Sequence, residues 1–367
     1  MAENLFSKYR PLFFDGIFGH DKIKKEFIQR AKEDNFPQAI MISGFTGTGK
    51  GCFEKIISKT ILCKDKKDNK PCNICEQCQT VINEKISQYY YMFNASNLGI
   101  DEMRGIEEIV AKKTLSTVNN KVIVIDELQE LANSSKALKA ILKVLEKPAK
   151  DVYFVLLCMD ENKIPTALKN RCVHYRLKNL TFEEVSTCLY SICTKENIKI
   201  DTEDKANTLI TIAQNSEGSM RTAISYLERC IYSELWDPKT VLNELGILST
   251  ESLSVMMNKL LSGDSSIFED TITKDTLEKI RWILNILYKN MNGVKLSQYY
   301  KSNIQGIIQV SEDKLYNTID KLNKLTFFPY INQELIDFTI IDILKANKAV
   351  TKLIDEQPKK RERIHVE

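Results

Sequence analysis

The chain lacks the marks of a membrane, secreted or strongly nucleic-acid-binding protein. No apolar run approaches the roughly 18 residues that a membrane-spanning helix needs. The first eight residues also lack a basic segment followed by an apolar stretch, and a formal net charge of +3 is too small to indicate a nucleic-acid partner. With 43% hydrophobic and 28% charged residues, we expect a cytoplasmic globular protein of two or three domains.

A hydroxyl is missing from the most informative motif. Residues 44–51 read GFTGTGKG, which is a phosphate-binding loop of the G-x-x-x-x-G-K-[ST] type except at its last position. In that pattern the loop N–H groups and the lysine bind phosphates, and the final hydroxyl ligates Mg²⁺. The residues we expect at the nucleotide phosphates are Gly44, Gly47, Thr48, Gly49, Lys50 and Gly51. Because Gly51 has no hydroxyl, the sequence predicts nucleotide binding but leaves hydrolysis in doubt.

Two acids follow an apolar run at residues 121–125. Asp126 and Glu127 end this predicted buried strand about 76 residues after the loop. In such a pair one carboxylate holds Mg²⁺, usually through water, and its neighbour orients the attacking water. We therefore predict that Asp126 is the metal-side acid and Glu127 the general base.

Of the ten cysteines, four have a spacing typical of metal binding. Cys63, Cys72, Cys75 and Cys78 form a C-x8-C-x2-C-x2-C pattern in a polar segment. Four thiolates suit tetrahedral Zn²⁺, and a closed shell of four ligands makes the predicted site structural rather than catalytic. An iron–sulfur cluster and unliganded cysteines are the alternatives.

The pattern of apolar residues divides the chain into three parts. Strand-like runs are expected at 39–42, 89–93, 122–125 and 152–157, with amphipathic stretches between them. This alternation predicts an α/β fold, a parallel sheet with helices on both faces. Helical patterns follow, and we expect a nucleotide-binding domain at 1–178 with the zinc module at 63–78, a helical lid at 179–245, a helical domain at 246–355 and a charged tail at 356–367.

Together these motifs resemble the gamma/tau ATPase of the bacterial DNA polymerase III clamp loader, an AAA+ family. The segment KYRP at 8–11, with Phe14, Asp15 and Gly19, looks like the family's N-terminal segment, and residues 94–104 are similar to the segment after its second strand. The zinc insertion is also a mark of the family. The resemblance covers residues 5 to about 245, and it implies that Tyr9 and Arg10 lie near the adenine and ribose of ATP.

The resemblance also implies roles for two arginines. Arg171, in the segment NRC, looks like the finger that reaches the ATP of a neighbouring subunit. Arg221, in GSMR, resembles the lid arginine that touches the phosphates bound to its own subunit. A guanidinium can bond two phosphate oxygens at once and does not lose its charge. We therefore count Arg171 and Arg221, with Lys50, Asp126 and Glu127, as the expected hydrolytic residues.

The family's partners and cofactors follow from the same resemblance. It implies ATP with Mg²⁺, a structural Zn²⁺, a collar domain at 246–355, and a ring shared with delta-type, delta-prime-type and further gamma subunits. It also implies a sliding clamp and primer–template DNA, met through the assembled complex during DNA replication. The long extension of tau forms is absent, so the chain looks like a short, gamma-type form.

A second departure concerns residues 156–160, which read LLCMD. The family's Thr-Thr before the aspartate is missing, so Cys158 or Met159 replaces the polar sensor of the γ-phosphate. Neither positions a water as a hydroxyl or amide does. We expect slow hydrolysis or none. The alternatives are a non-hydrolysing stator subunit like delta-prime and a different AAA+ ATPase of recombination or branch migration.

Overall fold

The computed structural model describes residues 4–112, 119–133, 135–244, 250–269, 272–294, 307–308, 310–325 and 331–355. The chain divides into two compact units, Met1–Val241 and Leu242–Glu367. Each unit has its own apolar core. The charged tail expected at 356–367 lies outside the described residues, as do parts of the expected helical domain.

A parallel sheet forms the centre of the first unit. Its strands are β1 (Ala39–Ser43), β2 (Tyr90–Asn94), β3 (Lys121–Asp126), β4 (Val152–Cys158) and β5 (Val173–Arg176). Their order is β2-β3-β4-β1-β5, and neighbouring strands are parallel throughout the sheet. The predicted α/β class is confirmed. No apolar run predicts β5, because this strand at the sheet edge buries only Tyr175.

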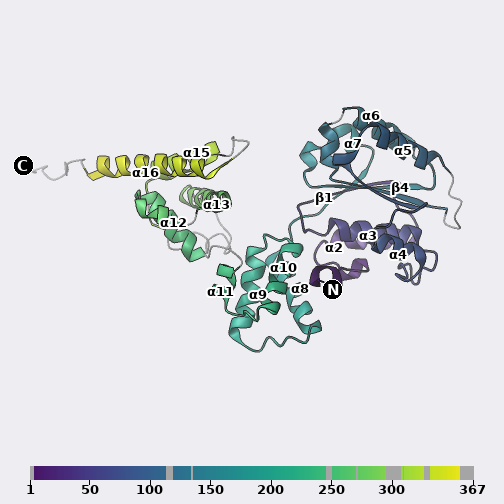
Figure 1. Cartoon of the computed structure of the whole chain (residues 1–367), viewed down its shortest axis with the longest axis horizontal. Helices are drawn as coiled ribbons and strands as arrows, with labels where there is room; N and C mark the ends of the chain where they lie inside the picture. Colours follow the sequence, from purple (N-terminus) through teal and green to yellow (C-terminus); the bar gives the residue numbers. More distant parts are fainter. Residues whose placement is uncertain are drawn as a thin grey trace, which may run out of the picture. The chain divides into compact units, whose positions relative to one another are not determined.

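Helices cover both faces of the sheet (Figure 1). Strand side chains alternate between the faces, so Ile40 and Ile42 join the core beneath α2 and α3, whereas Met41 joins the core beneath α5 and α6. The covering helices are α2 (Asp21–Lys32), α3 (Lys50–Leu62), α4 (Glu76–Ile82), α5 (Ile100–Ala111), α6 (Ser135–Glu146) and α7 (Thr166–Lys169). Burial on both faces explains why the central strands are continuous apolar runs.

The short elements of the first unit lie at its N-terminus and at strand ends. They are the helix α1 (Leu5–Lys8) and the 3₁₀ helices η1 (Phe14–Gly16), η2 (Ala95–Asn97), η3 (Leu128–Asn133) and η4 (Glu161–Lys163). Both η2 and η3 begin just beyond the carboxyl ends of parallel strands. In open parallel sheets this edge is where ligands bind.

A helical module completes the first unit. It consists of α8 (Phe182–Lys195), α9 (Glu203–Asn215), α10 (Met220–Tyr232) and α11 (Pro238–Glu244), the last of which crosses the boundary between the units. Thr181 and Glu184 form a capping box that starts α8, and such reciprocal bonds satisfy free N–H groups of a first turn. The backbone N–H of Met220 donates to the carbonyl of Gly47 at 3.0 Å, so this module contacts the phosphate loop directly.

The secondary structure that is described in the second unit consists of helices alone. Its elements are α12 (Thr250–Ser262), η5 (Ser265–Glu269), α13 (Lys274–Met291), α15 (Glu312–Leu325) and α16 (Gln333–Asp355). Leucine, isoleucine and methionine side chains of these helices form one core. Among the helices of both units that the structure describes, none is long and apolar enough to cross a membrane.

Candidate functional site

The phosphate loop connects β1 to α3 and has the backbone that its glycines permit. Gly44, Gly47 and Gly49 have φ values of +154°, +81° and +105°, which side-chain-bearing residues rarely adopt. A Cβ on Gly44 would lie 2.8 Å from the carbonyl oxygen of Leu177. A Cβ on Gly47 would lie 2.0 Å from Oγ of Ser219 in the helical module. Both close contacts and backbone angles therefore require glycine at these positions.

Lys50 begins α3 and folds back over the loop. Its Nζ donates to the carbonyl oxygens of Gly44 at 2.6 Å and Phe45 at 2.9 Å. Burial lowers the pKa of Lys50, and the nearby Asp126 and Cys158 act in the opposite direction. The ammonium thus lies beside the first acid of the predicted pair, in a loop at a helix N-terminus that suits a phosphate.

Gly51 occupies the first turn of α3, and its position has room for a side chain. A Cβ built there meets no atom within 4 Å. Crowding at the Cβ position therefore does not explain why this position lacks a side chain.

The two predicted acids lie at the carboxyl end of β3. Oδ1 of Asp126 accepts a bond from the backbone N–H of Glu127 at 2.7 Å. Glu127 has φ +53°, an uncommon backbone for a non-glycine residue and one that is concentrated at functional sites. Its Oε2 accepts a bond from Nδ2 of Asn94, at the end of the adjacent β2, at 2.9 Å. Asn94 thus fixes the orientation of the second acid.

At the end of β4, the two candidate sensor residues have different surroundings. Cys158 is completely buried, pairs in register with Ser43, and has its pKa raised to about 11 by burial. Met159 is 42% exposed, and its Sδ lies 3.7 Å from Oγ1 of Thr46 in the phosphate loop. Its backbone N–H donates to Oε1 of Gln129 at 3.1 Å. The sequence did not single out Gln129, a buried amide that places a polar group at this edge.

The N-terminal segment brings a further arginine toward the loop. Arg10 and Arg221 both act electrostatically on Cys52 in the first turn of α3, and Arg221 also acts on Lys50. The hydroxyl of Tyr9, the residue before Arg10, donates to Glu196 at the end of α8 at 2.6 Å. The structure therefore brings Arg10 and Arg221 to one side of the first turn of α3 and holds Tyr9 against the helical module.

Arg171 and the phosphate loop lie at opposite ends of the parallel strands. Arg171 precedes β5, whereas the loop follows β1, and the length of the four-residue strand β5 separates Arg171 from the loop by roughly 10 Å. Its Nη1 donates to the carbonyl of Ala167 at 2.7 Å and its Nη2 forms an ion pair with Glu146 at the end of α6. Within the described residues its Nε is buried without a hydrogen-bond partner. The structure does not bring Arg171 together with Lys50.

The four predicted metal ligands form one cluster. The sulfur atoms of Cys63, Cys72, Cys75 and Cys78 all lie within 4.8 Å of one another. Tetrahedral Zn²⁺ with Zn–S bonds of about 2.3 Å requires sulfurs about 3.8 Å apart, so the cluster fits the ion closely. Burial by itself raises the pKa of Cys72, but hydrogen bonds from the backbone N–H groups of Cys75 and Ile74, together with those to the side chains of Cys75 and Cys63, outweigh it and lower that pKa to about 7. A thiolate, the form that binds metal, is therefore accessible near neutral pH.

Two further polar contacts at the loop were not expected from the sequence. Nε2 of His20 lies 3.1 Å from the carbonyl oxygen of Thr48. Oγ of Ser43, the last residue of β1, lies 2.7 Å from Nε2 of His174 and 3.2 Å from Oε2 of Glu161. These residues come from separate segments of the sequence, so no local motif announces them.

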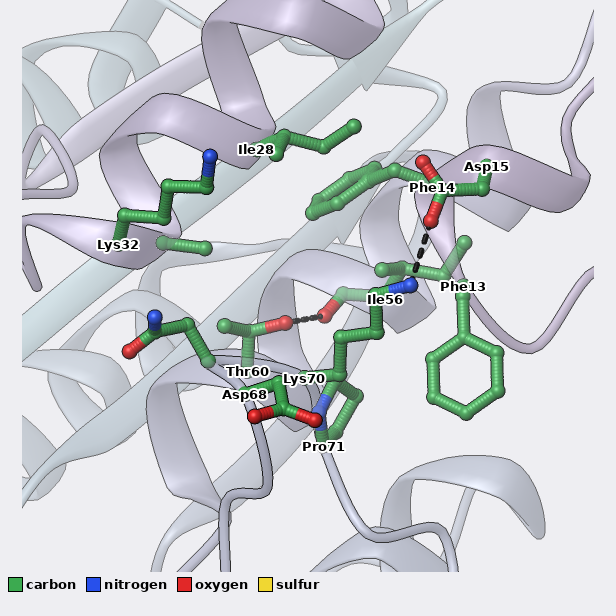
Figure 2. Close-up of a pocket in the computed structure, with 12 residues that line it drawn as sticks. Phe13, Phe14, Asp15, Ile28, Lys32, Ile56, Thr60, Asp68, Lys70 and Pro71 are labelled. Carbon is green, nitrogen blue, oxygen red and sulfur yellow. Dashed lines mark hydrogen bonds and ion pairs between the residues drawn. The ribbon is translucent and has the colours of Figure 1, made fainter.

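A cavity of about 70 Å³ lies between α2, η1, α3 and the cysteine segment 63–78, the predicted zinc segment (Figure 2). Phe14, Ile28 and Ile56 line it, and an ion pair of 2.6 Å joins Lys70 to Asp15 beside it. None of its lining residues belongs to the phosphate loop or to the acid pair. The cavity is a space next to the zinc segment rather than part of the nucleotide site.

Comparison with known proteins identifies relatives of both parts of the first unit. Residues 19–181 match the family model described as "DNA polymerase III, delta subunit", and residues 187–231 match the "RCF1/5-like, AAA+ ATPase lid domain". The chain is 29% identical over 347 residues to the DNA polymerase III subunit tau of Bacillus subtilis, covering 87% of this chain and 59% of that one. It is 28% identical over 332 residues to the subunit gamma of Buchnera aphidicola subsp. Baizongia pistaciae, with 86% and 87% covered.

The chain thus spans about three fifths of the Bacillus tau subunit and most of the Buchnera gamma subunit. Among solved structures, the RuvB Holliday junction branch migration motor of Thermotoga maritima aligns with 81% of this chain and 90% of its own, at 18% identity and a TM-score of 0.47. The helical lid, the parallel sheet and the sequence relatives agree with one another. Over most of its length the chain is therefore similar to gamma and tau subunits of DNA polymerase III, and residues 187–231 match an AAA+ lid domain.

Proposed function

We propose that this chain is the ATP-binding subunit of a clamp loader, and that it hydrolyses ATP slowly. The observation that carries the proposal is a phosphate loop with Lys50 in place beside Asp126, combined with a Gly51 that offers no hydroxyl. In the assembled ring the chain would help to open a sliding clamp and place it on primed DNA. Binding of ATP would change conformations rather than transform a small metabolite.

The loop lysine and the two acids have different roles toward the nucleotide. Lys50 exchanges its bonds to Gly44 and Phe45 for bonds to the terminal phosphates, which are stronger because both partners are charged. Glu127, held by Asn94, accepts a proton from the attacking water, and Asp126 is available to the metal side. Bound Mg²⁺ supplies neutralisation of the phosphate charge.

Two local features support slow hydrolysis. Without a hydroxyl at Gly51, one more water has to complete the metal shell, which Mg²⁺ tolerates. At the end of β4, burial keeps Cys158 a neutral thiol at physiological pH, and the thioether of Met159 faces the loop. Neither group holds a water as firmly as a hydroxyl or amide.

The position of Arg171 supports a role in a neighbouring subunit. Because β5 separates it from the chain's own loop, a phosphate that it binds belongs to another chain. We therefore propose a hetero-oligomeric ring with delta-type and delta-prime-type subunits.

Within this chain we assign a nucleotide-binding domain to 1–178, a lid to 179–245 and a collar to 246–355. The two compact units and the exposed apolar side chains of the second unit support this assignment.

The test is a steady-state ATPase assay of the assembled complex, comparing the native chain with Gly51→Thr. We expect the native rate to be low and the variant to raise it several-fold, because the new hydroxyl completes the Mg²⁺ shell. Gly105→Thr is the matched control, since its position in α5 is equally open, and Lys50→Ala should abolish turnover. A fast native rate that Gly51→Thr leaves unchanged would contradict the proposal.

A stator subunit like delta-prime is the second candidate. It would hold ATP without hydrolysing it and donate Arg171 to its neighbour. Gly51, the buried Cys158 and the match to the delta-subunit family model favour this alternative. The retained Lys50 and the fixed acid pair argue against it. Tight ATP retention with no phosphate release, even in Gly51→Thr, would favour the stator.

A further inference from the structure

We infer that Phe6 is a positioning residue for Arg221, and that the N-terminal helix thereby holds the lid arginine ready for nucleotide phosphates. This inference rests on the proposed nucleotide-binding function. Its basis is that the guanidinium carbon of Arg221 lies 5.0 Å from the centroid of the Phe6 ring, and that of Arg10 lies 5.4 Å from it. Both distances fall within the range of cation–π attraction.

The contact with the Phe6 ring matters because no carboxylate holds the Arg221 side chain in place within the described residues. In the part of the chain that the structure describes, Arg221 forms no ion pair, whereas Nη1 of Arg10 lies 3.7 Å from Oε1 of Glu84. Arg221 is also exposed and lies close enough to Lys50 and Cys52 to affect both electrostatically. Without an anion, like charges and the N-terminus of α3 repel this guanidinium. The π face of Phe6 offsets that repulsion.

Phe6 is itself held in place by bonds to the lid. The backbone N–H of Leu5 donates to Oε1 of Glu228 on α10 at 2.8 Å. On the other side of Phe6, Lys8 and Tyr9 both donate to Oε1 of Glu196 at the end of α8, each at 2.6 Å. The short helix α1 is therefore fixed to two helices of the module that carries Arg221, and its aromatic ring has a defined position.

A guanidinium over a ring keeps its in-plane N–H groups available. Arg221 can consequently stay near Phe6 and still bind phosphate oxygens, because the attraction to the ring uses the charge of the group and hydrogen bonding uses its N–H edge. Restricting the arginine in advance reduces the rotamer entropy that is lost when nucleotide binds. Phe6 should therefore raise nucleotide affinity through Arg221, without touching the nucleotide.

The test measures binding of a fluorescent ATP analogue, methylanthraniloyl-ATP with Mg²⁺, to the full chain. We expect Phe6→Leu to weaken binding about three- to tenfold, the range that a partly exposed cation–π contact supports, and Phe6→Tyr to bind like the native chain. In an Arg221→Ala background, Phe6→Leu should have no further effect. In an Arg10→Ala background its full effect should remain.

Results other than these would each contradict a specific part of the inference about Phe6. An equal loss from Phe6→Leu with and without Arg221 would show that Phe6 acts on stability or on another group, and a loss in Phe6→Tyr as large as in Phe6→Leu would exclude the aromatic ring as the cause. Thermal unfolding of each variant checks that the fold is intact. If the native chain and Lys50→Ala both fail to bind, the proposed function itself is wrong, and the role of Phe6 falls with it.

Discussion

At the scale of single residues, Glu54 is the least expected side chain near the phosphate loop. It lies one turn after Lys50 in α3, and only 1% of it is exposed. Its Oε1 accepts bonds from Ser58 at 2.8 Å and from Tyr90 at 3.2 Å. Burial raises the pKa of Glu54 to about 7, although Lys55 and both bonds favour the charged form. The carboxyl group is therefore near its titration point at physiological pH.

This residue predicts a pH dependence of stability. Because the pKa is higher in the folded than in the unfolded state, the folded chain binds more protons, and stability falls as pH rises from about 4.5 to about 7. Glu54→Gln keeps an oxygen for both bonds and removes the ionisation. Compared with the native chain, we expect the variant to gain on the order of 3 kcal/mol of unfolding free energy at pH 8 relative to pH 5.

Urea unfolding at pH 5, 6 and 8 measures this difference. Glu203→Gln, at an exposed position of α9, is the control and should follow the native profile. Parallel pH profiles for Glu54→Gln and the native chain would show that Glu54 is not neutralised by folding.

At the scale of elements, the helix after the loop differs from an ordinary amphipathic helix. Every residue of α3 from Phe53 to Leu62 is buried, including Glu54, Lys55 and Lys59. The sheet covers one side, and the zinc segment with α4 covers another. Lys59 bonds to the carbonyl of Leu12 at 3.0 Å and to Oδ1 of Asn73 within the cysteine segment. The cysteine segment thus contributes to the layer that shields the polar side of this helix.

Loss of zinc should therefore destabilise the first unit. Cys75→Ser removes one of the four ligands, and we expect it to lose zinc, measured by elemental analysis, and to lower the unfolding midpoint by roughly 5–10 °C, equivalent to about 2–3 kcal/mol. Cys52→Ser changes a thiol of α3 outside the cluster and should keep one zinc per chain. Full stability of Cys75→Ser without bound metal would show that packing alone holds the segment.

At the scale of the whole molecule, the second unit exposes large apolar side chains. Phe338 and Ile341 on α16 are 69% and 39% exposed, and Trp282 on α13 and Tyr316 on α15 are 43% and 57% exposed. Side chains of this kind are enriched at the centres of protein interfaces. Their position in the proposed collar agrees with a role in assembly.

Phe338→Glu should weaken that assembly. We expect the dissociation constant of the complex, measured by sedimentation velocity, to rise at least about tenfold, as for a central aromatic contact. Ile86→Glu is a matched control in the first unit, because Ile86 is 68% exposed, almost the same as Phe338. If both variants assemble like the native chain, α16 does not belong to the interface.

The sequence alone determined the chemistry-bearing local motifs and the class of fold. The loop glycines, the acid pair after an apolar strand and the four spaced cysteines were readable because each depends on backbone geometry or ligand spacing within one short segment. The strand and helix alternation was readable because burial on both faces leaves continuous apolar runs. The strand β5 escaped because it lies at the sheet edge and buries only one side chain.

Only the tertiary structure decided which distant residues meet. Asn94 with Glu127, Gln129 with Met159, His174 with Ser43 and Phe6 with Arg221 join segments far apart in the sequence. No local sequence pattern predicts such pairs, because they depend on the order of the strands in the sheet and on the packing of the lid. Likewise, composition could not show that Arg171 is separated from its own loop by β5, since that separation depends on the parallel register of β1 and β5.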